Sequence, residues 1–208
     1  MTDEKIQTLK DDIAFMKALA QEGGSAPLLG GSILVAAGLI FGGASVVHWA
    51  VLTGILAVTP WAFPILWVAA LGLFLVTLTI LNRRLRGKPG AGTPGNRAAG
   101  TAWAAVGWTI FAISLSLMII AIRAQSEIPM LVFPSLILGL YGMGWSVAAA
   151  MSGKRWIWLT AIGSYAGALV VAWFAIDPVV YLVYGAALLL LATLPGYVLM
   201  RQEPSDTI

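Results

Sequence analysis

The sequence predicts an all-α membrane protein in which six transmembrane helices form a bundle behind a short N-terminal amphipathic helix. Composition is the first observation that predicts this class. Of the 208 residues, 60% are hydrophobic and only 10% are charged, whereas an ordinary soluble domain has about a quarter charged residues. A single soluble core of this size cannot bury so much apolar surface. We therefore expect lipid to be the solvent for most of the chain.

Charge-free runs are the second observation. Six long stretches contain no Asp, Glu, Lys or Arg, and each is long enough for the roughly 20 helical residues that cross a bilayer. Strands of a membrane barrel alternate apolar and polar residues in segments of about ten, which these continuously apolar runs do not. The runs predict a transmembrane domain over residues 27–208, with spans at 28–49, 61–82, 99–122, 130–151, 156–176 and 179–200.

Proline and glycine mark the connections between these spans. The first run is longer than one helix needs, so residues 50–60 are expected to form an interfacial turn. Pro60 and Pro64 bracket the start of the second span, where a helix tolerates proline. Residues 83–98 include the stretch GKPGAGTPG and predict a flexible loop. This stretch lacks the spacing of a phosphate-binding loop, which argues against a nucleotide site.

The basic residues predict an orientation. Of the 12 Lys and Arg residues, all except Arg123 fall in the two tails or in the loops after the second and fourth spans. Basic loops stay in the cytoplasm, so both termini are expected there. Because this rule accounts for the basic loops, their charge does not indicate nucleic-acid binding. Short loops and the Ala- and Gly-rich composition favour a bacterial inner membrane.

The segment before the membrane, residues 1–26, carries the short amphipathic helix, predicted over residues 5–22. Its apolar residues follow the 3-4-3-4 spacing of a coiled-coil seam. One interpretation is a helix that lies on the inner leaflet. The other is a helix that pairs with a second copy of the chain or with a cytoplasmic partner protein. The predicted seam consists of Ile6, Leu9, Ile13, Met16 and Ala20.

Residue types that the chain lacks exclude several classes of chemical site. It contains no cysteine and one histidine, which excludes disulfides, thiolate chemistry and multi-histidine metal sites in one chain. No catalytic, cofactor-binding or metal-binding residue is predicted. No charged residue lies near a predicted helix centre, and ion-coupled carriers usually need one there. The hydroxyls within the spans are expected to bond to carbonyls of their own helices.

Four ionisable residues remain at the predicted outer ends of the spans. They could form an outward polar cluster that binds a small ligand or senses pH. Arg123 and Glu127 are spaced i, i+4 and could pair if the helix continues through them. The simpler interpretation is that helix ends are where charges cost least, and Asp177 before Pro178 is an ordinary turn residue. The candidate outer-face cluster is His48, Arg123, Glu127 and Asp177.

Two glycine pairs with GxxxG spacing are candidates for close helix packing. Gly38 and Gly42 lie in the first span, and Gly163 and Gly167 lie in the fifth. Packing within the bundle and homodimerisation are both compatible with them.

Taken together, these features predict a non-enzymatic multi-pass membrane protein that acts as a scaffold, sensor or regulatory subunit. Its N-terminal helix would contact the partner. The alternative is a small transporter or channel for a neutral or apolar solute, because charge-free helix centres do not oppose such a solute.

Overall fold

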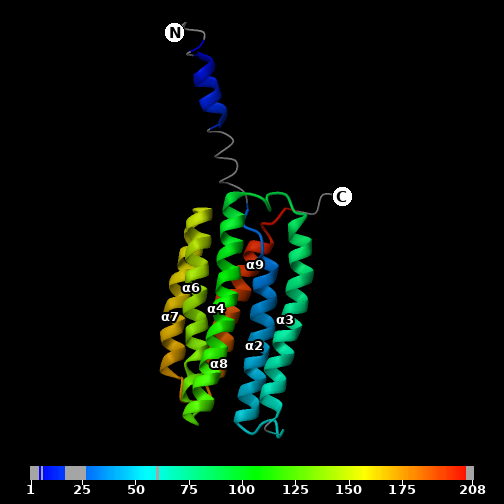
Figure 1. The fold of residues 1–208 in the computed structure, drawn as a ribbon, viewed down its shortest axis with the longest axis vertical. Coiled ribbons are helices and arrows are strands. Elements are labelled where there is room, and N and C mark those ends of the chain that lie inside the picture. The colour runs from blue at the N-terminus through cyan, green and yellow to red at the C-terminus, as the bar shows by residue number, and fades with distance from the viewer. Residues whose placement is uncertain (1–4, 6, 17–26, 60, 205–208) are drawn as a thin grey trace.

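The computed structural model describes residue 5 and residues 7–16, 27–59 and 61–204 of the chain. Six helical spans within these residues are long and apolar enough to cross a membrane. They run up and down beside one another, and a separate short helix at residues 7–16 precedes them (Figure 1). The structure thus confirms the predicted fold class, an all-α bundle of six spans with an N-terminal helix.

The observed boundaries differ from the predicted ones mainly at the connections. The fourth span is preceded by the one-turn helix α5, and the sixth contains a π-helical segment, η1. The elements are α2 (Gly31–Leu52), α3 (Ala62–Arg86), α4 (Pro94–Ala124), α5 (Ile128–Leu131), α6 (Phe133–Ser152), α7 (Arg155–Trp173), α8 (Val180–Leu188), η1 (Leu189–Thr193) and α9 (Leu194–Met200).

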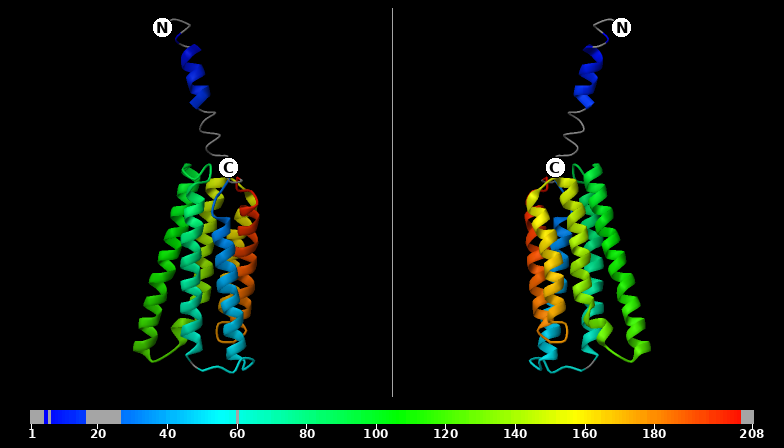
Figure 2. Two further views of the ribbon diagram at one scale, coloured as in Figure 1. Left: turned by 90° about the vertical axis from the view of Figure 1, so that its right-hand side faces the viewer. Right: turned by 90° about the vertical axis from the view of Figure 1, so that its left-hand side faces the viewer.

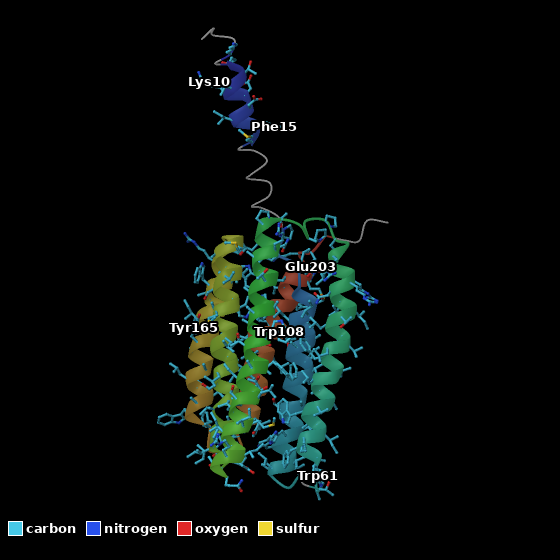
Figure 3. All side chains as sticks on the ribbon, viewed as in Figure 1. Lys10, Phe15, Trp61, Trp108, Tyr165 and Glu203 are labelled. Carbon is cyan, nitrogen blue, oxygen red and sulfur yellow. The ribbon has the colours of Figure 1, made fainter. Side chains whose placement is uncertain are left out.

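The chain enters the bundle at Pro27 and leaves it after Met200 at the same end, because Gly30 and Glu203 are hydrogen-bonded there. We call this the terminal end and the opposite end the distal end. Figure 3 places Glu203 at the terminal end and Trp61 at the distal end.

The connection between α3 and α4 is shorter than the predicted loop and is built from turns. The Thr93 side chain accepts a hydrogen bond from the Asn96 backbone N–H, and Pro94 occupies the first turn of α4. A threonine cap followed by proline is a strong helix start. Within the connection, the backbone N–H of Ala91 donates to the Lys88 carbonyl at 3.2 Å. Residues 87–93 are therefore the connecting segment, in place of the predicted 83–98.

The core is centred on α6. Leu138, Trp145 and Ala149 of this helix are fully buried, as is Ile157 of α7. Helix α3 packs mainly on α2, and α4 mainly on α6. Two side views show α3 and α4 on the outside of the bundle (Figure 2). In lipid, unlike in water, an exposed apolar side chain carries no penalty, because acyl chains are as apolar as leucine.

The sixth span approaches α2 closely and departs from regular α-helical geometry at η1. Gly38 of α2 lies directly against Thr193. A π-helical turn leaves carbonyls with altered partners, and the Trp145 indole N–H donates to the Leu191 carbonyl at 2.8 Å. One buried tryptophan on α6 therefore bonds to the irregular turn that also contacts Gly38 of α2.

Several hydroxyls within the spans bond to carbonyls of their own helices, whereas Ser135 of α6 donates to the Ala168 carbonyl of α7 at 2.8 Å. Ser164 donates to the Thr160 carbonyl at 2.9 Å, and Thr77 donates to the Leu73 carbonyl at 2.8 Å. Ser116 donates to Ala112 in the same way at 2.9 Å. The prediction that these groups bond to their own helices is confirmed at these positions.

Candidate functional site

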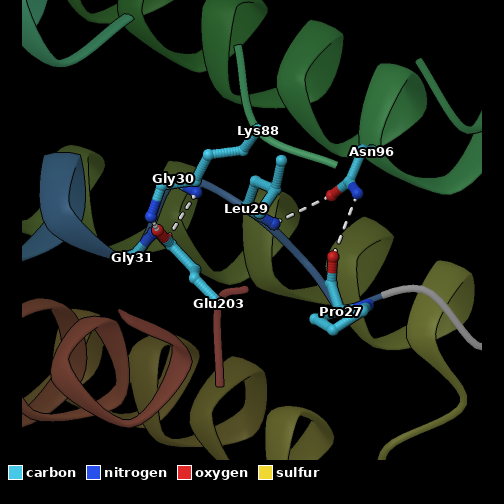
Figure 4. Close-up of polar contacts among 7 residues, drawn as sticks. All are labelled: Pro27, Leu29, Gly30, Gly31, Lys88, Asn96 and Glu203. Carbon is cyan, nitrogen blue, oxygen red and sulfur yellow. Dashed lines mark hydrogen bonds and ion pairs between the residues drawn. The ribbon is translucent and has the colours of Figure 1, made fainter. Parts of the chain in front are cut away.

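A polar cluster at the terminal end joins three segments that are far apart in the sequence. It consists of the side chains of Glu203, Lys88 and Asn96 and the backbone of residues 27–31 (Figure 4). We call it the terminal-end cluster. Residues 27–31 lead into α2. Lys88 and Asn96 belong to the connection between α3 and α4 and to the first turn of α4, and Glu203 follows α9.

Glu203 is the centre of this cluster. One carboxylate oxygen, Oε1, accepts hydrogen bonds from the backbone N–H groups of Gly30 and Gly31 at 3.1 and 3.0 Å. The other, Oε2, pairs with the Lys88 ammonium at 2.9 Å. The Glu203 side chain is only 2% exposed, whereas that of Lys88 is 18% exposed. The carboxylate is thus almost completely removed from solvent and is fully partnered.

The position of Glu203 is explained by the start of α2. Gly30 is the N-cap residue, with a φ of 102°, and no side chain of its own segment caps the helix. The first turn of a helix has free N–H groups and a positive end of the helix dipole. A carboxylate at this position accepts hydrogen bonds from the free N–H groups and is attracted by the positive end of the dipole. In this structure the carboxylate belongs to Glu203, which follows the last helix.

Asn96 makes the second set of contacts in the cluster. Its Oδ1 accepts from the Leu29 N–H at 2.8 Å, and its Nδ2 donates to the carbonyls of Pro27 and Gly90, both at 3.0 Å. Asn96 therefore fixes the chain just before α2 and the turn just before α4. Lys154, between α6 and α7, extends the network through a hydrogen bond to Gln202.

The terminal-end cluster is chemically suited to holding segments together. Its carboxylate, amide and ammonium groups all bond to one another or to backbone, so the geometry is that of an anchor. No group of three or more His, Asp or Glu residues that could hold a metal occurs among the described residues.

His48 lies in an aromatic environment near the distal end. The Trp67 indole N–H donates to His48 Nδ1 at 2.9 Å. The Tyr181 ring stacks on the imidazole with centroids 3.8 Å apart, and Phe63 lies at 4.5 Å. These rings come from α3 and α8, so His48 links α2 to both neighbours.

The other three candidates of the outer-face cluster lie at helix ends and in the turns between helices. The Asp177 Oδ1 accepts from the Val179 N–H at 2.8 Å, which is the turn role noted as the simpler interpretation. Arg123 and Glu127 form no ion pair, although their spacing suggested one. The reason is that α4 ends at Ala124 and Gln125 adopts a φ of 50°, so the helical register is lost between them. Within the described residues, no hydrogen bond or ion pair joins any two of the four candidates.

The four candidate glycines face neighbours inside the bundle. Gly38 lies against Thr193, and a Cβ on Gly42 would meet the Gly185 carbonyl at 3.5 Å. A Cβ on Gly163 or Gly167 would meet Leu191 at 3.0 or 3.2 Å. The structure therefore uses these positions for intramolecular packing between α2, α7 and the sixth span.

The N-terminal helix presents its apolar side chains to solvent. Leu9, Ile13 and Met16 of the predicted seam are 52%, 55% and 61% exposed, and the adjacent Phe15 is 67% exposed. Ile6 and Ala20, the two ends of the predicted seam, lie outside the described residues.

Sequence reasoning missed the terminal-end cluster. The motif Thr93-Pro94 signalled a helix start, but the surrounding glycines suggested a loop. Lys88 counted only as a basic loop residue. Glu203 lies 172 residues from Gly31, and no local pattern could connect them.

Comparison of this chain with protein families, curated proteins and solved structures gives no match. Its function must therefore be argued from the geometry alone.

Proposed function

We propose that this protein is a non-enzymatic multi-pass membrane scaffold, sensor or regulatory subunit that binds a partner through its N-terminal helix. The observation that carries the proposal is the exposed seam formed by Leu9, Ile13 and Met16 on the short helix outside the bundle. These residues are spaced i, i+4 and i+7, which places them on one face of a helix. Such a face gains free energy when it packs against a second helix.

The packing of the bundle supports a binding role over solute transport. Trp145, Leu138 and Ile157 fill the centre with fully buried side chains. The polar groups near the helix ends, such as His48 and Glu203, have partners within the chain. The alternative, a small transporter or channel for a neutral or apolar solute, has no comparable feature in its favour.

The partner is either a second copy of this chain or a cytoplasmic protein, and site-specific cross-linking separates these cases. The chain contains no cysteine, so each introduced cysteine is unique. Ile13→Cys places a label on the seam. Asp11→Cys, on the opposite face of the same helix, is the matched control. Each variant is labelled with a benzophenone maleimide in native membranes and irradiated.

The proposal expects a discrete protein adduct from the Ile13 label and none from the Asp11 label. An adduct of twice the chain's mass identifies a self-copy, and another defined mass identifies a different protein. Adducts with lipid alone would instead show a helix lying on the membrane, and the proposed function would then be abandoned.

A further inference from the structure

A shallow and largely open depression, called the groove below, runs along the terminal-end half of α4. Its upper part is lined by one face of α4, including Arg97, Thr101 and Ala105. Its lower part lies between α4 and α6 and is lined by Ala105, Gly144 and Met143, among others. Ala102 and Ala105 line both parts, so the two hollows form one groove.

The shape of this groove follows from small side chains. From Ala98 to Gly107, α4 is composed mostly of alanine and glycine, whereas its distal half carries Ile, Leu, Phe and Met. A helix with small side chains leaves a shallow channel beside its neighbour. The groove therefore exists in one half of the bundle and closes where the bulky residues begin.

The positively charged side chain of Arg97 lies at one end of the groove. The Arg97 side chain is exposed and forms no hydrogen bond or ion pair with the described part of the chain. Arginine binds phosphate well, because its planar guanidinium donates several hydrogen bonds to one anion. The hydroxyl-bearing Thr101 follows one turn later in the same lining.

The length of the groove fits one leaflet of a bilayer. From Arg97 to Thr109 the helix rises about 18 Å at 1.5 Å per residue. The hydrocarbon of one leaflet is about 15 Å thick. Thr109, the deepest lining residue of α4, is the midpoint of that helix, Pro94–Ala124. A transmembrane helix packed here would need a matching surface along the whole length of α4. The groove extends along only half of that length, which is the depth of one lipid leaflet.

We propose that this groove binds an anionic phospholipid from the leaflet at the terminal end of the bundle. The Arg97 guanidinium donates to the phosphate, and one acyl chain lies along Ala102 and Ala105 towards Gly144. This inference rests on the membrane-spanning fold and is independent of the proposed partner helix.

Native mass spectrometry of the purified full chain tests this site. Phosphatidylglycerol and phosphatidylcholine with identical acyl chains are titrated separately. We expect tighter binding of phosphatidylglycerol to the unmodified chain. Arg97→Gln should weaken that binding about tenfold, which corresponds to about 1.4 kcal/mol, because the guanidinium no longer donates to the phosphate. Arg84→Gln, an exposed arginine at the end of α3, should leave it unchanged.

The apolar part of the site needs its own variant. Ala105→Leu fills the groove and should weaken both lipids, whereas Ala104→Leu adds the same bulk at an exposed neighbour outside the lining and should weaken neither. Arg97→Lys, which keeps the charge, should retain a preference for phosphatidylglycerol.

Four results would overturn the proposal. They are equal binding of the two lipids, equal loss with Arg84→Gln, equal loss with Ala104→Leu, and displacement of phosphatidylglycerol by millimolar inorganic phosphate. Displacement by inorganic phosphate would show that Arg97 binds a free anion and not a lipid. If Ala105→Leu dissociated a dimer and left lipid binding intact, the groove would be an interface between two copies.

Discussion

Replacing Glu203 should release the start of the first span. Glu203→Ala removes an ion pair with Lys88 and two hydrogen bonds to backbone N–H groups at the start of α2. Removing one partner of a buried charge pair costs about 3 to 5 kcal/mol. Lys88 is 18% exposed and can turn towards water, which reduces the loss. We therefore expect destabilisation of about 3 kcal/mol, at the lower end of that range.

Two milder variants separate the contributions within the cluster. Glu203→Gln keeps an oxygen that can accept from Gly30 and Gly31 but removes the charge. Lys88→Met keeps the carboxylate at the helix start, where the helix dipole still favours it. Glu203→Ala should destabilise most, and Lys88→Met should cost at least as much as Glu203→Gln, because it leaves a 2%-exposed carboxylate without its counter-charge. Glu127→Gln makes the same chemical change at an exposed position and should shift stability by less than about 0.5 kcal/mol.

Thermal unfolding in a mild detergent measures these differences. The chain has nine tryptophans, so intrinsic fluorescence reports the transition. For a chain of this size, 1 kcal/mol corresponds to about 2 to 4 °C in Tm, so Glu203→Ala should lower Tm by about 6 to 12 °C. If its Tm stayed within about 1 °C of the unmodified protein, or if Glu127→Gln had an equal effect, the carboxylate would not anchor α2.

Three further substitutions test other parts of the structure with the same assay. Asn96→Ala removes three hydrogen bonds of the terminal-end cluster and should cost about 2 kcal/mol, whereas Asn82→Ala, exposed at the end of α3, should be nearly neutral; equal effects would refute the role of Asn96. His48→Phe leaves the Trp67 indole N–H without its acceptor and should cost about 1 to 3 kcal/mol, and it should cost less when Trp67→Phe is also present; strictly additive losses would show that the two rings do not interact. Gly38→Ala forces a methyl group against Thr193, whereas Gly43→Ala meets no atom within 4 Å. The first should destabilise by about 1 to 3 kcal/mol and the second should stabilise by up to about 1 kcal/mol, so changes of the same sign would contradict the packing described for α2.

The six spans could be predicted because lipid imposes one strong rule on sequence. Charged side chains are excluded from the centre of the membrane, so the runs between charged residues mark the helices. The ends were less accurate. The first run contains no charge to show that α2 ends at Leu52, and the glycines of residues 87–93 obscured the cap at Thr93 that starts α4.

Features that depend on distant contacts could not be predicted. The segment Leu189–Thr193 is compatible with an ordinary α-helix, and its π-helical form accompanies contacts with Gly38 and Trp145 from other helices. The aromatic surroundings of His48 come from two other helices. The spacing of Arg123 and Glu127 gives an i, i+4 pair only while the helix continues, and the sequence did not show that α4 ends at Ala124, before Gln125.

The bond between Glu203 and the start of α2 also has a consequence for biosynthesis. The first span is made early, but its capping carboxylate emerges only after the sixth span has been translated. A chain truncated after Met200 would contain every membrane helix and still leave the N–H groups of Gly30 and Gly31 without their acceptor. The start of α2 can therefore be capped in this way only once synthesis has passed Glu203.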